Sequence, residues 1–164
     1  MKTKSILIVD DEQSVCTSLE KALSKNGYTT RTAGSGNEAL KILAKSPIDI
    51  VLSDLIMPDG DGFYLLREIK KKYVHIEVIL LTGYGTIEKA VEAMKEGAYD
   101  FITKPFKKSV ILSTVERAIE RQNLTLENRY LKNQLSRGSA FREIIGKSKA
   151  IQDVLQMVER VAPL

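Results

Sequence analysis

The sequence predicts an α/β fold in which helices cover both faces of a parallel β-sheet. Short runs of apolar or β-branched residues alternate with amphipathic helical patterns, and turn residues bound each run. Alternating strands and helices form right-handed βαβ crossovers, which make the strands parallel. Three runs, Ile6–Val9, Ile50–Leu52 and Val78–Leu81, are apolar without interruption, as expected for central strands that are buried on both sides.

Five strands are expected along the chain. They are Ser5–Val9, Thr29–Ala33, Ile48–Ser53, Glu77–Leu81 and Asp100–Thr103. The second of these alternates polar and apolar residues, so we expect it at an edge of the sheet. Five strands with five helices fit a flavodoxin-like sheet with the strand order 2-1-3-4-5.

Helical periodicity fills the segments between the strands. The first helix ends at the stop signal Asn26-Gly27, and a later one ends at Gly97. The apolar face of the first helix consists of Val15, Leu19, Ala22 and Leu23. The same pattern recurs in the later helix at Ile87, Ala90, Val91 and Met94.

A long helix is expected after Pro105, from about Ser109 to Ser136, because this stretch contains no Gly or Pro. Two series of apolar residues lie at coiled-coil spacings but out of phase, so a continuous seam needs a stutter. They are Leu112, Val115, Ile119 and Leu126, and Leu124, Leu131 and Leu135. The second half extends beyond any sheet that it could cover, which favours dimerisation through this helix.

The predicted helix is interrupted at Arg137-Gly138-Ser139, and Ser148–Val161 is expected to form a further amphipathic helix. One helix cannot enclose a core, so this last segment is expected to begin a domain that the chain does not complete. The expected organisation has three parts: a domain over residues 1–107, an extended helix and coiled-coil linker over 108–137, and the start of a truncated domain over 138–164.

Composition is typical of a soluble protein. Of the 164 residues, 43% are hydrophobic, which is ample for one core. No run of about eighteen apolar residues appears, and Met1-Lys2-Thr3-Lys4 leads directly into a strand, so a cytoplasmic protein with no membrane contact is expected. The only cysteine, Cys16, is expected to be a buried thiol.

The net charge of +4 comes from the C-terminal part. Residues 1–106 contain 14 basic and 15 acidic side chains, whereas residues 107–164 contain 11 and 6. Nucleic-acid binding by this part is an open alternative, but it has no interleaved aromatic residues and no groove-reading motif. A solvated helical face is favoured.

Acidic residues follow two of the central strands. Asp10 and Asp11 come directly after the first strand and Asp54 follows the third. Because the carboxyl ends of parallel strands meet at one edge of the sheet, we expect these carboxylates to lie close together. Their mutual repulsion favours a divalent cation. Hard oxygen ligands without a Cys or His cluster favour Mg²⁺, with Mn²⁺ as an alternative, over Zn²⁺.

A magnesium site of this kind commonly joins carboxylates to a phosphate. Asp54 is the expected phosphoacceptor, because a carboxylate can attack phosphorus and form an aspartyl phosphate. Lys104, after the fifth strand, is expected to pair with one phosphoryl oxygen, and the Thr82 hydroxyl, at the end of the fourth, with another.

Two loops are expected to shape this pocket. A cis bond between Lys104 and Pro105 is predicted, since it turns the chain sharply enough to aim the lysine inward. After Asp54, Gly60 and Gly62 are expected to give the loop the freedom to wrap the metal, with the main-chain carbonyl of Ile56 as a further ligand.

Each of these residues also has an ordinary structural interpretation. Taken singly, an Asp after a strand is usually a turn or cap residue, and Lys-Pro is usually part of a loop. Taken together, residues suited to one phosphoryl site follow several strands that end on the same side of the sheet, and this favours the functional interpretation. His75 begins a strand without a partner motif and is expected to be a surface or structural residue.

Asp10-Asp11, Asp54, Thr82 and Lys104-Pro105, in this order and at these separations, strongly resemble the receiver domain of two-component response regulators. The resemblance covers residues 5 to about 120. It implies that Asp54 takes a phosphoryl group from the phosphohistidine of a sensor histidine kinase. It also implies that Asp10, Asp11, Asp54 and the Ile56 carbonyl are arranged around Mg²⁺. The chain is then a phosphoryl acceptor rather than an enzyme.

The resemblance places Phe101 at the position of the family's switch aromatic. In this family the switch aromatic moves inward when the hydroxyl at the position of Thr82 swings toward the phosphate. The family often has Tyr there, so any role of Phe101 is steric. The expected output is a changed dimer contact through residues 86–120, continued into the helix over 109–136.

The stretch Leu81–Phe106 resembles the NtrC-type subfamily of sigma-54-dependent transcription activators. Residues 141–164 are similar to the beginning of that family's AAA+ ATPase domain. In the full-length protein this implies sigma-54 RNA polymerase and DNA as partners, which this fragment is not expected to bind. Gly146-Lys147-Ser148 lacks the first glycine of a P-loop because Phe141 stands there, so no nucleotide site is expected.

Three other classes compete with this interpretation. An aspartate-nucleophile phosphatase needs Asp-x-Asp-x-Thr after the first strand, and an FMN carrier needs a phosphate loop rich in hydroxyls and glycine. The sequence after Val9 is acidic and matches neither. A pseudo-receiver that serves only as a dimerising scaffold stays open, although Asp54, Thr82 and Lys104 disfavour it.

Overall fold

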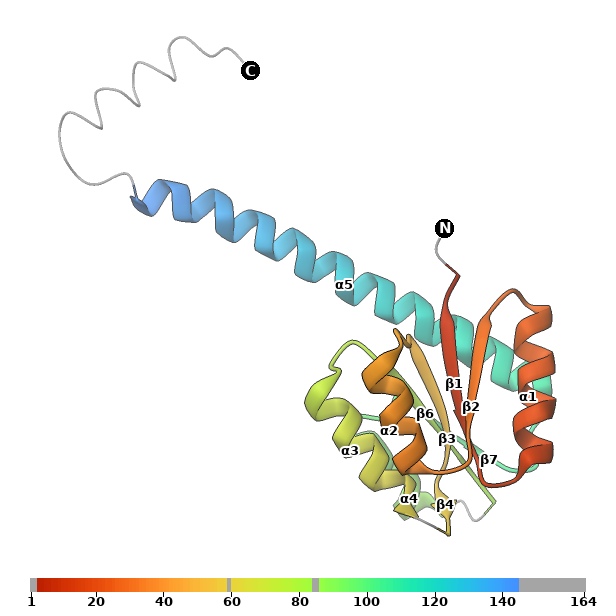
Figure 1. Ribbon diagram of the computed structural model, residues 1–164. Coiled ribbons are helices and arrows are strands. Elements are labelled where there is room, and N and C mark those ends of the chain that lie inside the picture. The colour runs from red at the N-terminus through yellow and green to blue at the C-terminus, as the bar shows by residue number, and fades with distance from the viewer. Residues whose placement is uncertain (1–2, 59, 84–85, 145–164) are drawn as a thin grey trace, which may run out of the picture. The chain divides into compact units, whose positions relative to one another are not determined.

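The structure is a computed structural model that describes residues 3–58, 60–83 and 86–144. Five parallel strands form one sheet in the order β2-β1-β3-β6-β7. The strands are β1 (Ser5–Val9), β2 (Thr29–Ala33), β3 (Ile50–Asp54), β6 (Glu77–Thr82) and β7 (Asp100–Thr103). This is the predicted flavodoxin-like order, with β2 at an edge and β1, β3 and β6 in the interior (Figure 1).

Helices connect the strands. They are α1 (Gln13–Lys25), α2 (Gly36–Lys45), α3 (Gly62–Lys72), α4 (Ile87–Lys95) and α5 (Lys108–Ile144). Two of them begin at side-chain caps, which satisfy backbone N–H groups that have no partner inside the helix. Ser35 accepts from the amide of Glu38 at 3.2 Å, and Thr86 accepts from the amide of Lys89 at 3.3 Å.

The sheet divides the core into two layers because successive strand residues point to opposite faces. Ile6 and Ile8 of β1 pack with α1 and α5, whereas Leu7 and Val9 pack with α2 and α3. In Figure 1 α1 and α2 lie on opposite sides of the sheet. Strands that are buried on both faces explain the uninterrupted apolar runs of the sequence.

A short antiparallel hairpin, which the sequence did not predict, follows β3. It pairs β4 (Ile56–Met57) with β5 (Gly60–Asp61). Two strands of two residues each are too short for a periodic pattern to reveal them. The hairpin lies between β3 and α3 and therefore fixes the chain just after Asp54.

Helix α4 contributes little to the core. Its buried residue is Ala93, whereas Ile87, Val91 and Met94 are 82%, 47% and 50% exposed. The apolar pattern of the sequence therefore marks a surface stripe on this helix.

Helix α5 runs through the break predicted at Arg137-Gly138-Ser139 and reaches Ile144. The helix interruption predicted at these residues is therefore wrong. A single glycine in a helix costs only about 1 kcal/mol relative to alanine, and no proline follows it to stop the helix. The predicted helix Ser148–Val161 lies outside the described residues, as does Gly146-Lys147-Ser148, at which no nucleotide site is expected.

The chain divides into two compact units, Met1–Asn123 and Leu124–Leu164. The boundary falls within α5, at the point where the helix stops contributing buried residues to the sheet. Within the described ranges 3–58, 60–83 and 86–144, no helix is both long and apolar enough to span a bilayer.

Candidate functional site

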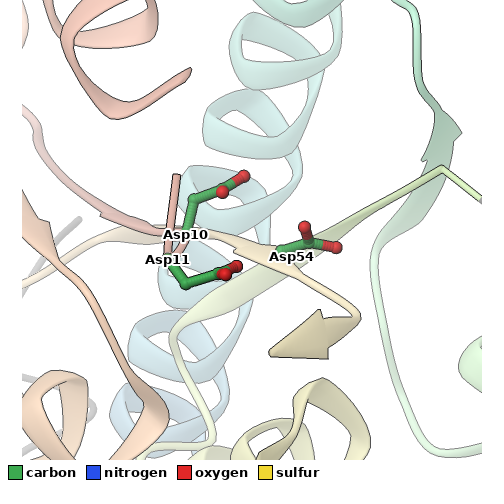
Figure 2. A group of neighbouring side chains, drawn as sticks. All are labelled: Asp10, Asp11 and Asp54. Atoms are coloured by element: carbon green, nitrogen blue, oxygen red, sulfur yellow. The ribbon is translucent and has the colours of Figure 1, made fainter. Parts of the chain in front are cut away.

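Three carboxylates gather at the carboxyl ends of β1 and β3. Each of Asp10, Asp11 and Asp54 offers an oxygen atom, and these atoms all lie within 4.8 Å of one another (Figure 2). Asp10 and Asp54 are 2% and 8% exposed, whereas Asp11 is exposed. The sequence predicted this grouping, because β1 and β3 are neighbours in the sheet, β1 leads into Asp10 and β3 ends at Asp54.

Lys104 joins two of these carboxylates. Its Nζ atom donates to Asp10 Oδ2 and to Asp54 Oδ2, both at 2.7 Å. The other oxygen of each carboxylate accepts a backbone N–H: that of Glu12 at 2.9 Å for Asp10, and that of Ile56 at 3.2 Å for Asp54. Both carboxylates are therefore held in fixed orientations at the carboxyl ends of β1 and β3.

Burial alone would lower the pKa of Lys104, because desolvation disfavours its charged form. Hydrogen bonds and charges from Asp10 and Asp54 outweigh that effect, so the pKa is raised. Lys104 is therefore an ammonium at neutral pH. The pocket holds one positive charge among three carboxylates, and it retains a negative excess that favours a divalent cation.

The peptide bond between Lys104 and Pro105 is cis, as the sequence predicted. The backbone amide of Lys104 donates to the carbonyl of Thr82 at 2.6 Å. This hydrogen bond joins the end of β7 to the end of β6 and brings Lys104 to the acidic site.

Thr82 lies on β6, which is next to β3, and Phe101 lies on β7, which is next to β6. Thr82 is fully buried at the end of β6, where it pairs in register with Thr103. Phe101, in β7, is partly buried and packs against the core layer that contains Leu80. The predicted phosphoryl partner and the predicted switch aromatic therefore lie on neighbouring strands.

Gly62, the first residue of α3, lies close to the backbone of Asp54. A Cβ atom at Gly62 would lie 2.5 Å from the Asp54 carbonyl oxygen and 2.8 Å from the Leu55 Cα. The Gly62 amide donates to the Leu55 carbonyl at 2.8 Å. The sequence interpretation of Gly62 as a flexible loop residue therefore needs correction: its function is to leave space for close backbone packing.

Cys16, which contacts the backbone of Asp10, is a buried thiol, as the sequence predicted. Its Sγ atom donates to the Asp10 carbonyl at 3.4 Å. Burial, and then the charge of Asp10, raise the pKa of this thiol. A protonated, inaccessible thiol has a packing role.

The donor set fits Mg²⁺. Carboxylate oxygens are hard ligands, and Mg²⁺ commonly uses one or two carboxylates together with a phosphate and water. Asp11 is exposed, so it can turn toward an ion without breaking a buried contact. Ile56 follows Asp54 by two residues in β4, which places its main chain beside the carboxylates.

Comparisons with known proteins agree with the fold and with this site. The family model of the response regulator receiver domain matches residues 6–116. The regulatory protein AtoC of Escherichia coli (strain K12) is 36% identical over 157 residues, which cover 96% of this chain and 34% of AtoC. The transcriptional regulator NtrC of Salmonella typhimurium is 35% identical over 162 residues, which cover 99% of this chain and 34% of NtrC.

Two solved structures are similar over different lengths. The beryllofluoride-activated NtrC4 receiver domain dimer matches with a TM-score of 0.71 at 38% identity, covering 73% of this chain and 99% of that one. NtrX from Brucella abortus, in complex with ADP, matches with a TM-score of 0.76 at 36% identity, covering 99% of this chain and 35% of that one.

The chain belongs to the response regulator receiver domain family and closely resembles the NtrC-type members over nearly its whole length. It spans about a third of the length of these curated relatives. A receiver domain is a signalling module and not an enzyme in the usual sense.

Proposed function

We propose that this chain is the phosphorylation-controlled receiver of an NtrC-type regulator, and that Asp54 accepts a phosphoryl group from the phosphohistidine of a sensor histidine kinase. One observation supports this most strongly: the buried carboxylate of Asp54 ends a central strand beside Asp10, Asp11 and Lys104. Membership of the receiver family implies phosphorylation signalling.

In the proposed reaction a carboxylate oxygen of Asp54 attacks phosphorus while the bond between phosphorus and the imidazole nitrogen breaks. The electron pair of that bond stays on the imidazole, and Asp54 becomes an aspartyl phosphate. Mg²⁺, held by Asp10, Asp11, Asp54 and the Ile56 carbonyl, would offset charge on the transferring oxygens. Lys104 would then turn from the Asp54 carboxylate to a phosphoryl oxygen.

The proposed response uses β6, which is next to β3, and β7, which is next to β6. The hydroxyl of Thr82, at the end of β6, would donate to another phosphoryl oxygen. Phe101, on the neighbouring strand, would then move further into the core. A difference of a few kcal/mol between two such states changes which one predominates.

The proposed output is a homodimer contact through residues 86–136. Helix α4 presents the exposed stripe Ile87, Val91 and Met94 on one face, and contiguous exposed apolar patches mark interaction surfaces. Helix α5 also carries exposed apolar residues: Val110, Leu124, Leu126, Tyr130 and Leu131. The similar NtrC4 receiver domain is a dimer in its activated form.

The full-length protein is proposed to be a cytoplasmic sigma-54-dependent activator. Its receiver would control assembly of an AAA+ ATPase that begins within residues 138–164. Sigma-54 RNA polymerase and DNA would be partners of the parts beyond this chain. Support comes from the relatives AtoC and NtrC, the latter described as a DNA-binding transcriptional regulator.

Incubation with a small phosphodonor and Mg²⁺, followed by intact mass measurement, tests this function. We expect the chain to gain the mass of one phosphoryl group, and expect Asp54→Asn to gain none. Retention of the mass gain in Asp54→Asn would contradict the proposal. No mass gain in the parent chain, with dimers present, would favour the pseudo-receiver scaffold.

A further inference from the structure

Gln122 is a buried amide at the end of an apolar stripe on α5. The stripe consists of Ile111, Val115 and Ala118, which pack in one core layer. Gln122 continues the same spacing and is 2% exposed, whereas residues 123–134 are all exposed. A polar side chain in the last buried position of such a stripe needs hydrogen-bond partners.

The side-chain amide of Gln122 has three hydrogen-bond partners, which bind its nitrogen and its oxygen. Its Nε2 atom donates to the carbonyl of Asp49 at 3.0 Å and to the carbonyl of His75 at 2.8 Å. Its Oε1 atom accepts from Lys4 Nζ at 2.7 Å. These partners fix the orientation of the amide, because a reversed group would place its oxygen against two carbonyl oxygens.

The partners of Gln122 lie at the N-terminal edge of the sheet, just before three central strands. Lys4 precedes β1, Asp49 precedes β3 and His75 lies shortly before β6. Lys4 also pairs with Asp49 at 3.0 Å. Figure 1 shows α5 passing the end of the sheet at which β1 begins.

These are the same three strands whose other ends lead to the acidic site. β1 leads into Asp10, β3 ends at Asp54 and β6 ends at Thr82. Gln122 therefore joins α5 to three of the four strands that position residues of the proposed phosphoryl site, at the opposite end of these strands; the fourth is β7, which leads into Lys104.

The neighbouring Arg121 makes a more exposed contact with the sheet. It lies 3.7 Å from Glu77 Oε1 and 5.4 Å from the ring centroid of Tyr99, and its side chain is 60% exposed. Exposed ion pairs contribute little to stability. Gln122, in contrast, makes its hydrogen bonds from a buried side chain.

We propose that Gln122 is a positioning residue that fixes the last sheet-bound turn of α5 to β1, β3 and β6, so that this turn and the acidic site shift together. The regulatory part of this inference rests on the proposed function, because it assumes that the signal leaves through α5. A leucine at this position would fill similar space without the three hydrogen bonds. The substitution therefore separates the effect of the hydrogen bonds from the effect of packing.

Hydrogen exchange of the unphosphorylated chain tests the attachment. In Gln122→Leu we expect the backbone amides of residues 118–126 to exchange at least about tenfold faster, since the buried bonds of this turn are lost. The matched control is Gln134→Leu, the same change at an exposed position of α5, which should leave these amides unchanged. Equal exchange in Gln122→Leu and the parent chain would overturn the inference.

A second pair of variants separates this attachment from a general loss of stability. Lys4→Met should speed exchange of the same amides in the parent chain but add little in Gln122→Leu, because the two residues form one contact. Additive effects would overturn the inference.

Phosphorylation-dependent dimerisation provides the functional readout. We expect Gln122→Leu to gain phosphoryl mass as the parent does, but to dimerise at least about fivefold more weakly when phosphorylated. Unchanged dimerisation would overturn the regulatory part of the inference. Absence of a mass gain in the parent chain would instead contradict the proposed function and leave the exchange result standing.

Discussion

Lys104 Nζ lies 2.7 Å from Asp54 Oδ2 and donates a hydrogen bond to it. The same ammonium group lies 2.7 Å from Asp10 Oδ2. One protein cation thus lies between two of the carboxylates that are proposed to hold Mg²⁺. Lys104 is therefore both a competitor for the metal and the proposed partner of the phosphoryl group.

Removal of this cation should favour metal binding. In Lys104→Met, Asp10 and Asp54 lose their shared counter-charge, so we expect Mg²⁺ to bind about tenfold more tightly, as measured by calorimetry. Phosphorylation should nevertheless become slower, because a phosphoryl oxygen loses its ammonium partner. Lys107→Met, at an exposed position nearby, is the control. Unchanged or weaker Mg²⁺ binding in Lys104→Met would contradict this relationship.

The raised pKa of Lys104 predicts a loss of stability at alkaline pH. The ammonium is favoured in the folded state, so its contribution is complete below the unfolded pKa of about 10.4 and disappears as the pH rises through the folded pKa. We expect the free energy of unfolding to fall above about pH 10 in the parent chain and to fall less in Lys104→Met. Parallel curves from urea denaturation would be inconsistent with this coupling.

Asp11 is the one exposed carboxylate of the three. Asp11→Asn should weaken Mg²⁺ binding about tenfold, because a charged ligand is lost, and should change the free energy of unfolding by less than about 0.5 kcal/mol. Glu12→Gln is the matched control, since Glu12 is a neighbouring acid outside the group of three. If both variants bind Mg²⁺ equally well, Asp11 is not a ligand.

Gly62→Ala should destabilise the protein by about 1–3 kcal/mol, because the new Cβ atom would lie 2.5 Å from the Asp54 carbonyl oxygen. Gly83→Ala provides a control, since a Cβ atom there meets nothing within 4 Å. Urea denaturation measures both changes. Equal stability of the two variants would show that the packing at Gly62 is not restrictive.

Val91→Asp tests the proposed dimer surface. Val91 is 47% exposed, so the fold should tolerate the change, and a charge in the apolar stripe should weaken dimers of the phosphorylated chain at least about tenfold. The phosphoryl mass gain should persist. Sedimentation of the phosphorylated chain measures the dimer, and unchanged dimerisation would place the contact elsewhere.

The sheet and most of the acidic site could be predicted from sequence for one physical reason. Central strands buried on both faces are continuously apolar, and acidic residues at their carboxyl ends must emerge on the same side of the sheet. Asp10 and Asp54 therefore stood out before their distance was known, and the comparisons confirm the fold and the family.

Features that depend on space or on distant partners were not predictable in this way. The close approach of Gly62 to Asp54 depends on a backbone distance, and the contacts of Gln122 span 47 to 118 residues in sequence. The apolar stripe of α4 indicated a helix correctly, but periodicity does not distinguish a core face from an exposed one. Gly138 was interpreted as a stop signal, but a helix can also continue through a single glycine, at a cost of about 1 kcal/mol relative to alanine.

Locating the phosphoryl group on the chain tests the central claim most directly. After treatment with a small phosphodonor and Mg²⁺, proteolysis and fragment mass analysis should place the added phosphoryl group on Asp54, and removal of Mg²⁺ with a chelator before treatment should prevent its addition. A phosphoryl group found on another residue, or added equally well without Mg²⁺, would contradict the assignment of this acidic site.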